Sequence, residues 1–466
     1  MGQVSPNRHK RIQDLDIKKL KHVKKIRADY VRSSQKIRII RINPVRKFKV
    51  GGLILVLVIL ALALIFFNSE TFVILKIANS LRGKNTLIGF QNSAELRPTG
   101  GFWGSFATLS VDKKIIKPQI NFNIETNVYR NDNQLVAMDL DNAPKPVRET
   151  FINRPQTFVN ANWDTDFPEA AKTLSWYFGQ GWEKPIDNVI AISSTTVIDL
   201  LKITGPITLS DGTEINCDNF SSIMSQKIDQ DYWFNEKNKV ENEPKKILLE
   251  ILPKLTEKFK GIGKFKLFSK TFLYLNEKNV IIYSSDTKIQ SLIEKRGWGG
   301  NIPQWGNDFL YVINANLNGG KSSLNIDQVL NLNVRQKGKD LESELTIVRT
   351  HNPNPLGPDI LNRNYTRVLV PMDAKIESVK LAGEGIYPDN CDEAIESGKK
   401  SIGFWFSTGF GKESSVKIQY QLPSNITKKN YKLIIMRQPG TNFDSLHLDL
   451  FGKKQIDTQL IKDLSF

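Results

Sequence analysis

The run of residues 50–67, VGGLILVLVILALALIFF, constrains this chain more than any other feature, because its 18 residues include no charged or strongly polar side chain. A helix needs about 20 apolar residues to cross the ~30 Å hydrocarbon core of a bilayer. A helix buried in a soluble core normally keeps a polar face, and this run has none. We therefore predict a single transmembrane helix over residues 50–68.

The alternative to an anchor is a cleaved signal peptide. The basic segment ahead of the run is far longer than a signal n-region, and FFNSE offers no small-x-small cleavage pattern. Four Lys/Arg lie between residues 41 and 49, whereas only Lys76 and Arg82 follow within the next fifteen residues. The positive-inside rule then predicts an uncleaved, single-pass protein of the cell membrane, with a cytoplasmic N-terminus and an extracytoplasmic body.

Positive charge is concentrated in the predicted cytoplasmic tail. Residues 1–49 hold 16 of the 65 Lys/Arg and 3 of the 48 Asp/Glu, a net charge of +13, which leaves only +4 for the rest of the chain. A general nucleic-acid-binding protein carries basic patches on its folded part, so this distribution disfavours that class. We expect the tail to contact anionic membrane lipid. A cytoplasmic protein partner and nucleic acid are the alternatives for the tail.

The exported part divides into two kinds of pattern. Residues 83–305 alternate strand-like and helix-like segments, with paired strands over 86–122, a helix over 167–180, an apolar strand over 186–193 and a helix over 195–205. This order predicts an α/β layered domain. Residues 306–466 instead show short alternating strands at roughly 8–12-residue spacing, which predicts an antiparallel β-sandwich module. We interpret residues 316–321, NLNGGK, as a hairpin turn, with Lys321 directed at a ligand as the alternative.

Familiar enzymatic motifs are missing from the sequence. It contains no His-Glu-x-x-His and no Gly-x-Ser-x-Gly, and residues 409–414, GFGKES, lack the remaining glycine and the Gly-Lys-Ser/Thr of a phosphate-binding loop. Four histidines and two cysteines cannot build a His-rich or Cys-based metal cluster. No cofactor is therefore evident. Cys217 and Cys391 can form one bridge in an extracytoplasmic body or stay unpaired.

One candidate site is the glycine-rich bend over residues 91–104, QNSAELRPTGGFWG. Glu95, Arg97 and Thr99 lie where side chains and backbone N–H groups can converge on an anion, and the guanidinium fork suits phosphate. The alternative is a local Glu95–Arg97 ion pair on an ordinary hairpin.

The second candidate site is the loop over residues 160–168, NANWDTDFP, which contributes Asn162, Asp164 and Asp166. Carboxylates just before a helix cap its free N–H groups. Alternatively, Asp164 and Asp166 hold a hard cation such as Mg²⁺, with phosphate oxygens of a substrate completing its coordination.

Several motifs in order resemble the domain-of-unknown-function 4012 family of bacterial membrane-anchored proteins: NSAELRPTGGFWGSFATLSVD, ANWDTDFPEAA, IDNVIAISSTTVIDLLKITGPI, GWGG and NANLNGGK. A fainter similarity is to the LytR-CpsA-Psr family, which transfers polyprenyl-pyrophosphate-linked glycopolymers onto peptidoglycan. That resemblance implies the same α/β core and an arginine and acidic set around a metal. Only Arg97 has a counterpart in that set, and residues 121–126, NFNIET, lack the second arginine.

Two functions follow from these observations. The first is a non-catalytic, membrane-anchored cell-envelope protein that binds envelope glycopolymer, a polyprenyl-linked carrier or a protein partner. The alternative is a divergent, Mg²⁺-dependent phosphotransferase that attaches polyprenyl-pyrophosphate-linked glycopolymer to the cell wall. The alternative requires both candidate sites to face one pocket, because a metal–phosphate cluster has ligand distances near 2 Å and cannot bridge more than about 15 Å.

Overall fold

The computed structural model describes residues 69–114, 118–125, 143–151, 158–182, 185–241, 243–353, 361–442 and 444–466. Residues 73–466 form one compact unit. The predicted tail and transmembrane helix lie outside the described residues. Within the described ranges, no helix has the length and apolar character needed to span a membrane.

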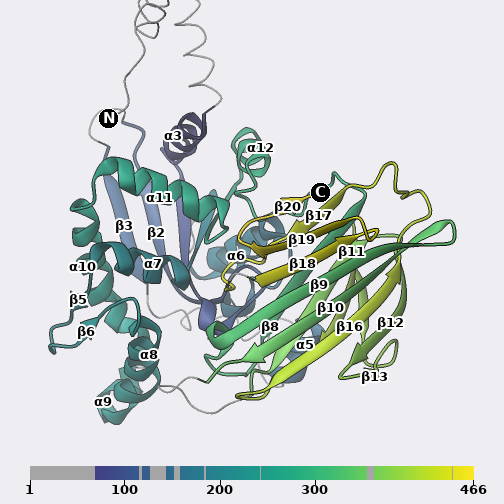
Figure 1. The fold of residues 1–466 in the computed structure, drawn as a ribbon. Helices are drawn as coiled ribbons and strands as arrows, with labels where there is room; N and C mark the ends of the chain where they lie inside the picture. Colours follow the sequence, from purple (N-terminus) through teal and green to yellow (C-terminus); the bar gives the residue numbers. More distant parts are fainter. Residues whose placement is uncertain are drawn as a thin grey trace, which may run out of the picture. The chain divides into compact units, whose positions relative to one another are not determined.

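A five-stranded sheet organises the first half of this unit, with the strand order β3-β2-β1-β4-β7 (Figure 1). Its strands are β1 (Asn85–Asn92), β2 (Phe102–Val111), β3 (Ile120–Glu125), β4 (Asn188–Ser193) and β7 (Val280–Ser284). Strand β1 pairs antiparallel with β2 and parallel with β4. The predicted mixed α/β architecture is confirmed.

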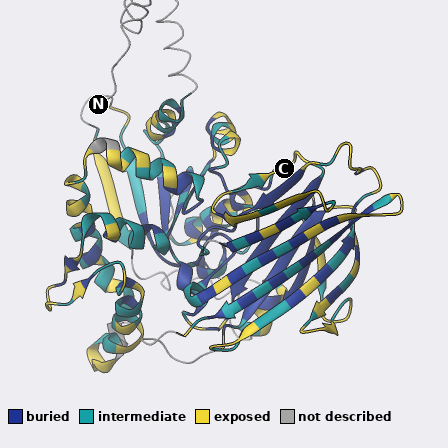
Figure 2. Cartoon of the chain, viewed as in Figure 1, coloured by how far each residue is buried: buried dark blue, intermediate teal, exposed yellow. Residues whose placement is uncertain are grey.

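Helices cover both faces of this sheet because its central strands bury alternate residues on opposite sides. Val189 and Ala191 of β4 pack in the cluster that contains α6 (Phe167–Trp182), whereas Ile190 packs in the cluster of α11 (Lys264–Asn276) and α12 (Thr287–Lys295). Helix α3 (Glu70–Ser80) contributes Val73 and Ile77 to the latter cluster. Strand β3 is a largely exposed edge, drawn in yellow in Figure 2.

The remaining elements of this half are short. Helices α7 and α10 share a small separate core with β5 and β6. The bounds are α5 (Lys145–Thr150), α7 (Ser194–Thr204), α8 (Phe220–Ser225), α9 (Glu236–Glu241), α10 (Leu248–Lys260), β5 (Ile207–Thr208) and β6 (Glu214–Ile215). Single turns are η1 (Ser93–Glu95), η3 (Phe158–Asn160), η4 (Gln226–Gln230), η5 (Asp231–Phe234) and η6 (Pro244–Ile247).

Two sheets packed around one large hydrophobic cluster form the second half. The six-stranded sheet has the order β14-β15-β11-β8-β17-β20, with bounds β14 (Asp392–Glu396), β15 (Lys399–Trp405), β11 (Asn364–Pro371), β8 (Asp308–Asn316), β17 (Leu433–Met436) and β20 (Leu464–Ser465). The seven-stranded sheet has the order β13-β12-β16-β10-β9-β18-β19, with bounds β13 (Glu384–Gly385), β12 (Lys375–Leu381), β16 (Glu413–Gln421), β10 (Asp340–His351), β9 (Ile326–Lys337), β18 (Asp444–Leu450) and β19 (Lys454–Leu460); the turn η7 (Ser323–Asn325) precedes β9.

The prediction of an antiparallel sandwich is wrong in one respect. Strand β17 runs parallel to β8, and β18 runs parallel to β9, so each sheet holds one parallel pair. Alternation along a strand reports which face is buried and says nothing about the direction of its neighbour. Strands β17 and β18 lie beside β8 and β9, and the connections that lead into them are residues 422–432 and 437–443.

The prediction of a hairpin at residues 316–321 is also wrong. Strand β8 belongs to the six-stranded sheet and β9 to the seven-stranded sheet, so the segment crosses between layers. A Cβ atom on Gly319 would lie 2.4 Å from the backbone nitrogen of Arg363, and this close approach explains the glycine. Lys321 forms an ion pair with Asp229. Cys217 and Cys391 are both free and half-exposed.

Candidate functional site

The two loops predicted to carry the site meet directly. The Asn162 amide nitrogen donates to the Thr99 hydroxyl at 2.7 Å, to the Gly101 carbonyl at 2.8 Å and to the Gln91 side-chain oxygen at 3.2 Å. Thr99 in turn donates to Gln91 at 2.6 Å. Asn162, Thr99 and Gln91 are at most 2% exposed. They form a buried polar cluster at the carboxyl end of β1, in which the Asn162 side-chain oxygen has no hydrogen-bond partner among the described residues.

Arg97 lies in the contact between the two halves of the molecule. Its guanidinium donates to the carbonyl oxygens of Leu96 and of Asn316, the last residue of β8, and stacks over the Phe102 ring at 5.4 Å. The side chain is buried, and this burial lowers the pKa of Arg97 to about 10. Glu95 accepts a hydrogen bond from Asn92. The described contacts of Arg97 therefore join the bend to the sandwich.

Gln438 of the sandwich also forms hydrogen bonds to the glycine-rich bend. Its amide nitrogen donates to the carbonyls of Arg97 and Asn314, and its oxygen accepts from the Asn314 backbone. A small cavity with room for about one water lies beside this contact, lined in part by Ser93, Arg349 and Asp444. The halves are thus joined by buried polar groups.

Asp164 and Asp166 organise the start of α6. Asp164 accepts from the Asp166 backbone N–H at 2.9 Å, and the Asp166 carboxylate accepts from the Ile302 N–H at 2.9 Å. Burial raises the pKa of both, that of Asp166 to about 6. Both carboxylates accept from backbone N–H groups, but the donors are Asp166, just before α6, and Ile302, which lies outside it. Across the described ranges, no group of three or more His, Cys, Asp or Glu side chains is arranged to hold a metal ion.

A row of aromatic rings flanked by two arginines lies next to Asp164. Arg363 stacks on Trp405 at 3.9 Å, Trp405 meets Tyr365 edge-on at 5.4 Å, Tyr365 lies 6.2 Å from Trp163, and Arg367 stacks on Trp163 at 4.6 Å. We call these five residues the aromatic row. Trp163 and Trp405 are half-buried, so neither residue is fully enclosed.

Carboxylates line the polar edge of the aromatic row. Glu149 accepts from the Trp405 indole N–H at 3.2 Å, and Asp392 accepts from the Tyr365 hydroxyl at 2.8 Å. Glu396 accepts from Arg367 at 2.7 Å, while Arg367 also donates to the Trp163 carbonyl. The row is therefore held in one geometry by contacts from both halves of the molecule.

Sequence reasoning named the loop that contains Trp163 and missed the rest of the row. One signal was readable in the sequence: Tyr365 and Arg367 lie two residues apart on one strand, β11, and therefore point to the same face. Trp405 could not be placed, because its pairing opposite Tyr365 depends on the register between β11 and β15.

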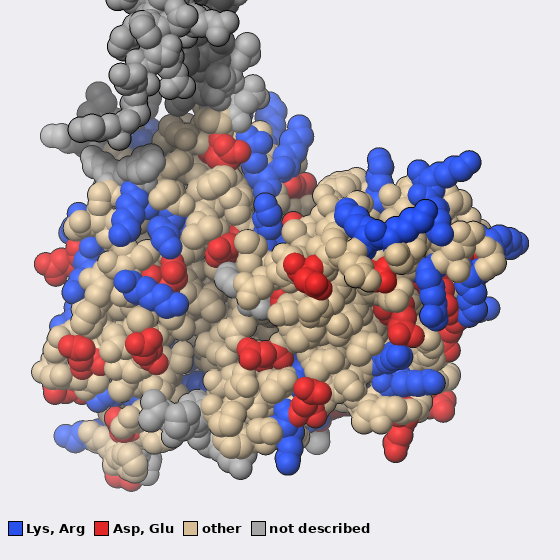
Figure 3. Space-filling view, viewed as in Figure 1, with Lys and Arg blue, Asp and Glu red and all other residues tan. Residues whose placement is uncertain are grey.

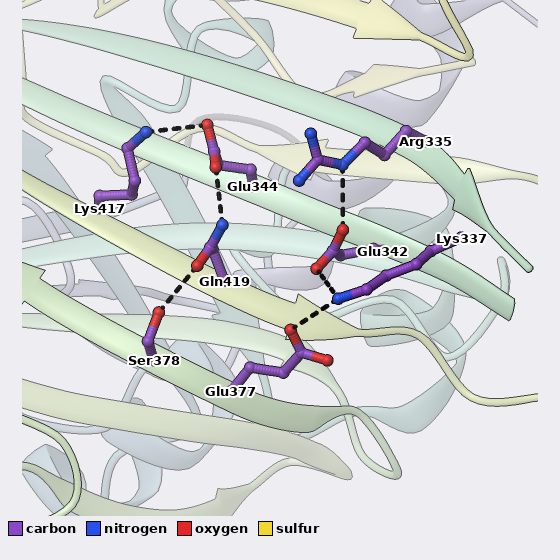
Figure 4. Close-up of polar contacts among 8 residues, drawn as sticks. All are labelled: Arg335, Lys337, Glu342, Glu344, Glu377, Ser378, Lys417 and Gln419. Carbon is purple, nitrogen blue, oxygen red and sulfur yellow. Dashed lines mark hydrogen bonds and ion pairs between the residues drawn. The ribbon is translucent and has the colours of Figure 1, made fainter.

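A second polar cluster covers the outer face of the seven-stranded sheet (Figure 4). Glu342, whose side chain is only 4% exposed, accepts from Arg335 at 3.0 Å and Lys337 at 2.8 Å. Glu344 accepts from Lys417 at 3.0 Å and Gln419 at 2.8 Å. These groups satisfy one another across neighbouring strands, as cross-strand pairs do in sheets.

Comparison with known families supports one of the two resemblances. Residues 83–228 match the family described as "Protein of unknown function (DUF4012)". The match ends before the sandwich, and the LytR-CpsA-Psr resemblance stays a prediction. No curated protein matches the sequence.

Solved structures offer only distant likenesses. The protein Lin1025 from Listeria innocua shares 9% identity, covering 49% of this chain and 86% of its own, with a TM-score of 0.25. An M1 zinc metallopeptidase from Deinococcus radiodurans shares 13% identity, covering 27% of this chain and 31% of its own, with a TM-score of 0.16. Yeast LTA4 hydrolase shares 10% identity, covering 29% and 26%, with a TM-score of 0.14. These TM-scores are too low to support an argument about fold or function.

Proposed function

We propose that this chain is a membrane-anchored, extracytoplasmic protein of the cell envelope that binds envelope glycopolymer without transferring it. The single observation that carries the binding proposal is the aromatic row with its carboxylate edge. The anchor and its orientation rest on the apolar run of residues 50–67 and on the charges that flank it.

The chemistry of the aromatic row suits a saccharide. A sugar ring has an apolar C–H face and a rim of hydroxyl groups, and ligand sites combine aromatic walls with a few placed polar groups. The half-buried indoles of Trp163 and Trp405 offer the aromatic surface. Glu149, Asp392 and Glu396 offer hydrogen-bond acceptors next to it.

The proposal does not extend to phosphoryl transfer, because that chemistry needs cationic groups aimed at the developing charge. Arg97 donates instead to two backbone carbonyls, and Asp164 and Asp166 accept from backbone N–H groups. The candidate transfer residues are thus engaged in internal contacts.

A binding experiment on the full chain in detergent micelles tests this function. Soluble cell-wall glycan chains are titrated while tryptophan fluorescence is followed, and Trp405→Ala is compared with the unaltered protein. Loss of one aromatic contact weakens binding by about tenfold. Trp176→Ala is the matched control, because Trp176 is 46% exposed on α6 and lies outside the aromatic row.

Thermal unfolding of both variants shows whether each remains folded, and Trp405→Phe retains a ring at the position. Equal glycan affinity of a folded Trp405→Ala variant and the unaltered protein contradicts the proposal. Capture of a protein from an envelope extract, with no glycan binding, favours a protein partner instead.

A further inference from the structure

Five lysines gather at one end of the sandwich. The connection from β16 to β17, residues 422–432, contributes Lys428, Lys429 and Lys432. The segment 451–454, the turn after β18 with the first residue of β19, contributes Lys453 and Lys454. Neither segment contains an Asp or Glu. All five lysines are exposed, and we call them the lysine end.

Ring contacts place the two segments side by side. The Lys428 ammonium lies 5.1 Å from the centre of the Phe451 ring, and Tyr431 meets the same ring edge-on at 5.2 Å. Lys454 lies over Phe466, whose backbone pairs with Leu433, the residue after Lys432. Figure 3 shows Lys and Arg side chains gathered over the upper right of the sandwich.

The lysine end lacks the acidic partners that Lys337 and Lys417 have on the outer sheet face. Lys337 and Lys417 on the outer sheet face are each paired with a glutamate (Figure 4). Among the described residues, none of the five lysines makes an ion pair with Asp or Glu within 4.0 Å. Their charge is therefore available to an external anion.

The lysine end lies on the side of the sandwich away from the junction of the two halves. In the first sheet, the end of β1 that follows α3 also lies away from this junction. Strand β8 starts beside Leu433 and finishes at Asn316, which bonds to Leu96 in the junction. Strand β1 likewise starts just after α3 and finishes near Leu96. In Figure 1, α3 and the C-terminus both lie in the upper part of the view.

The link between the predicted membrane span and the compact unit is short, and it keeps this side of the unit near the bilayer. Only residues 69–72 separate the predicted membrane span from Val73, where the compact unit begins. Even a fully extended segment of that length reaches only about 15 Å. The start of the unit must therefore stay close to the membrane surface.

We propose that the lysine end docks on the anionic phospholipid headgroups of the bilayer that holds the anchor. Polybasic segments next to a membrane are attracted to anionic lipid, and the attraction falls off within a Debye length of about 10 Å. This inference rests on the anchor in the proposed function and is independent of the glycan site. Docking orients the sandwich beside the membrane.

The test uses the full chain reconstituted into vesicles of phosphatidylcholine alone, or of phosphatidylcholine mixed equally with phosphatidylglycerol. A water-soluble amine-reactive ester labels exposed lysines, and mass spectrometry measures each site. In anionic vesicles we expect labelling of the lysine end to fall about threefold or more, and high salt to restore it. Lys380 is the internal reference, because it is exposed near the C-terminal end of β12, away from the lysine end.

A variant separates lipid docking from other causes of protection. Replacing Lys428, Lys429, Lys453 and Lys454 by glutamate should return Lys432 to the labelling rate seen in neutral vesicles, whereas Lys380→Glu should leave the protection unchanged. All these positions are exposed, so the variants should fold.

The outcomes distinguish this inference from the proposed function. If the chain fails to enter vesicles at all, the anchor is wrong and the inference falls with it. Should the chain insert but label equally in both lipids, only the docking is overturned. Protection by a soluble anionic wall polymer, with none from anionic vesicles, also overturns lipid docking and identifies a polymer contact.

Discussion

The Asn162 side-chain nitrogen donates to the Thr99 hydroxyl oxygen at 2.7 Å, and this bond ties the loop before α6 to the bend after β1. Neither side chain reaches solvent. Polar residues that resemble ligand-binding groups in the sequence are here one another's partners. The cluster therefore positions the loop whose next residue, Trp163, belongs to the aromatic row.

Asn162→Ala should lower the free energy of unfolding by about 2 kcal/mol, because it leaves Thr99, Gln91 and the Gly101 carbonyl short of a buried donor. Urea unfolding of the full chain in detergent measures the change. Asn333→Ala, at an exposed position on β9, should shift the value by no more than about 0.5 kcal/mol. Equal effects of the two substitutions would show that the buried cluster contributes nothing specific.

Gly440→Ala should destabilise the junction of the two halves. A Cβ atom at Gly440 would lie 1.9 Å from the Gly100 carbonyl oxygen, and the backbone there has a φ of +74°. We expect a loss of about 2 kcal/mol or more. Gly338 has a φ of +65° with no atom near a built Cβ, so Gly338→Ala should cost only about 1 kcal/mol. If thermal unfolding shows equal losses of stability for Gly440→Ala and Gly338→Ala, the close approach at Gly440 is contradicted.

The free energy of unfolding should fall as pH rises from about 4 to 6. Burial raises the pKa of Asp166, Asp308 and Asp444 to about 6 in each case. A folded pKa above the unfolded value means that the native state binds more protons in this window, so deprotonation destabilises it. Each group contributes on the order of 3 kcal/mol.

Asp308→Asn should remove one of the three contributions to this fall in the free energy of unfolding with pH. Urea unfolding midpoints between about pH 4 and pH 7 measure the change. Glu342 has the opposite sign: its bonds to Lys337 and Arg335 lower its pKa, so its stabilisation is lost as pH falls below about 4.5. Glu342→Gln should therefore lower the free energy of unfolding above about pH 4.5 and reduce its further loss at lower pH. A profile that Asp308→Asn leaves unaltered would rule out the buried carboxylate as its source.

Arg97→Ala should cost about 3 kcal/mol, because two buried carbonyls lose a charged donor. Polyprenyl pyrophosphate with Mg²⁺ should not shift the thermal unfolding of the unaltered chain. A ligand present at 100 times its dissociation constant would add ~2.7 kcal/mol. Such a shift, absent from a folded Arg97→Lys variant, would restore the phosphotransferase alternative.

Local pattern predicted much of the fold. The spacing of Phe167, Ala170, Ala171, Leu174 and Phe178 predicts α6, since residues three and four apart share a helix face. Short alternating strands after Asp308 predicted the sandwich. Pattern could not give the direction of β17 and β18 or the layer crossing at Gly319, because these depend on contacts between distant segments.

The same division holds for the candidate site. Turn residues and periodicity act locally, so they place Thr99 and Asn162 in loops between strands and helices. The partners of these side chains are set by packing between distant segments. Arg97 contacts Asn316, which lies 219 residues further along the chain, and Trp163 contacts Tyr365. Composition cannot distinguish a side chain aimed at a ligand from one satisfied by a distant backbone carbonyl, because burial and partner are both set by packing.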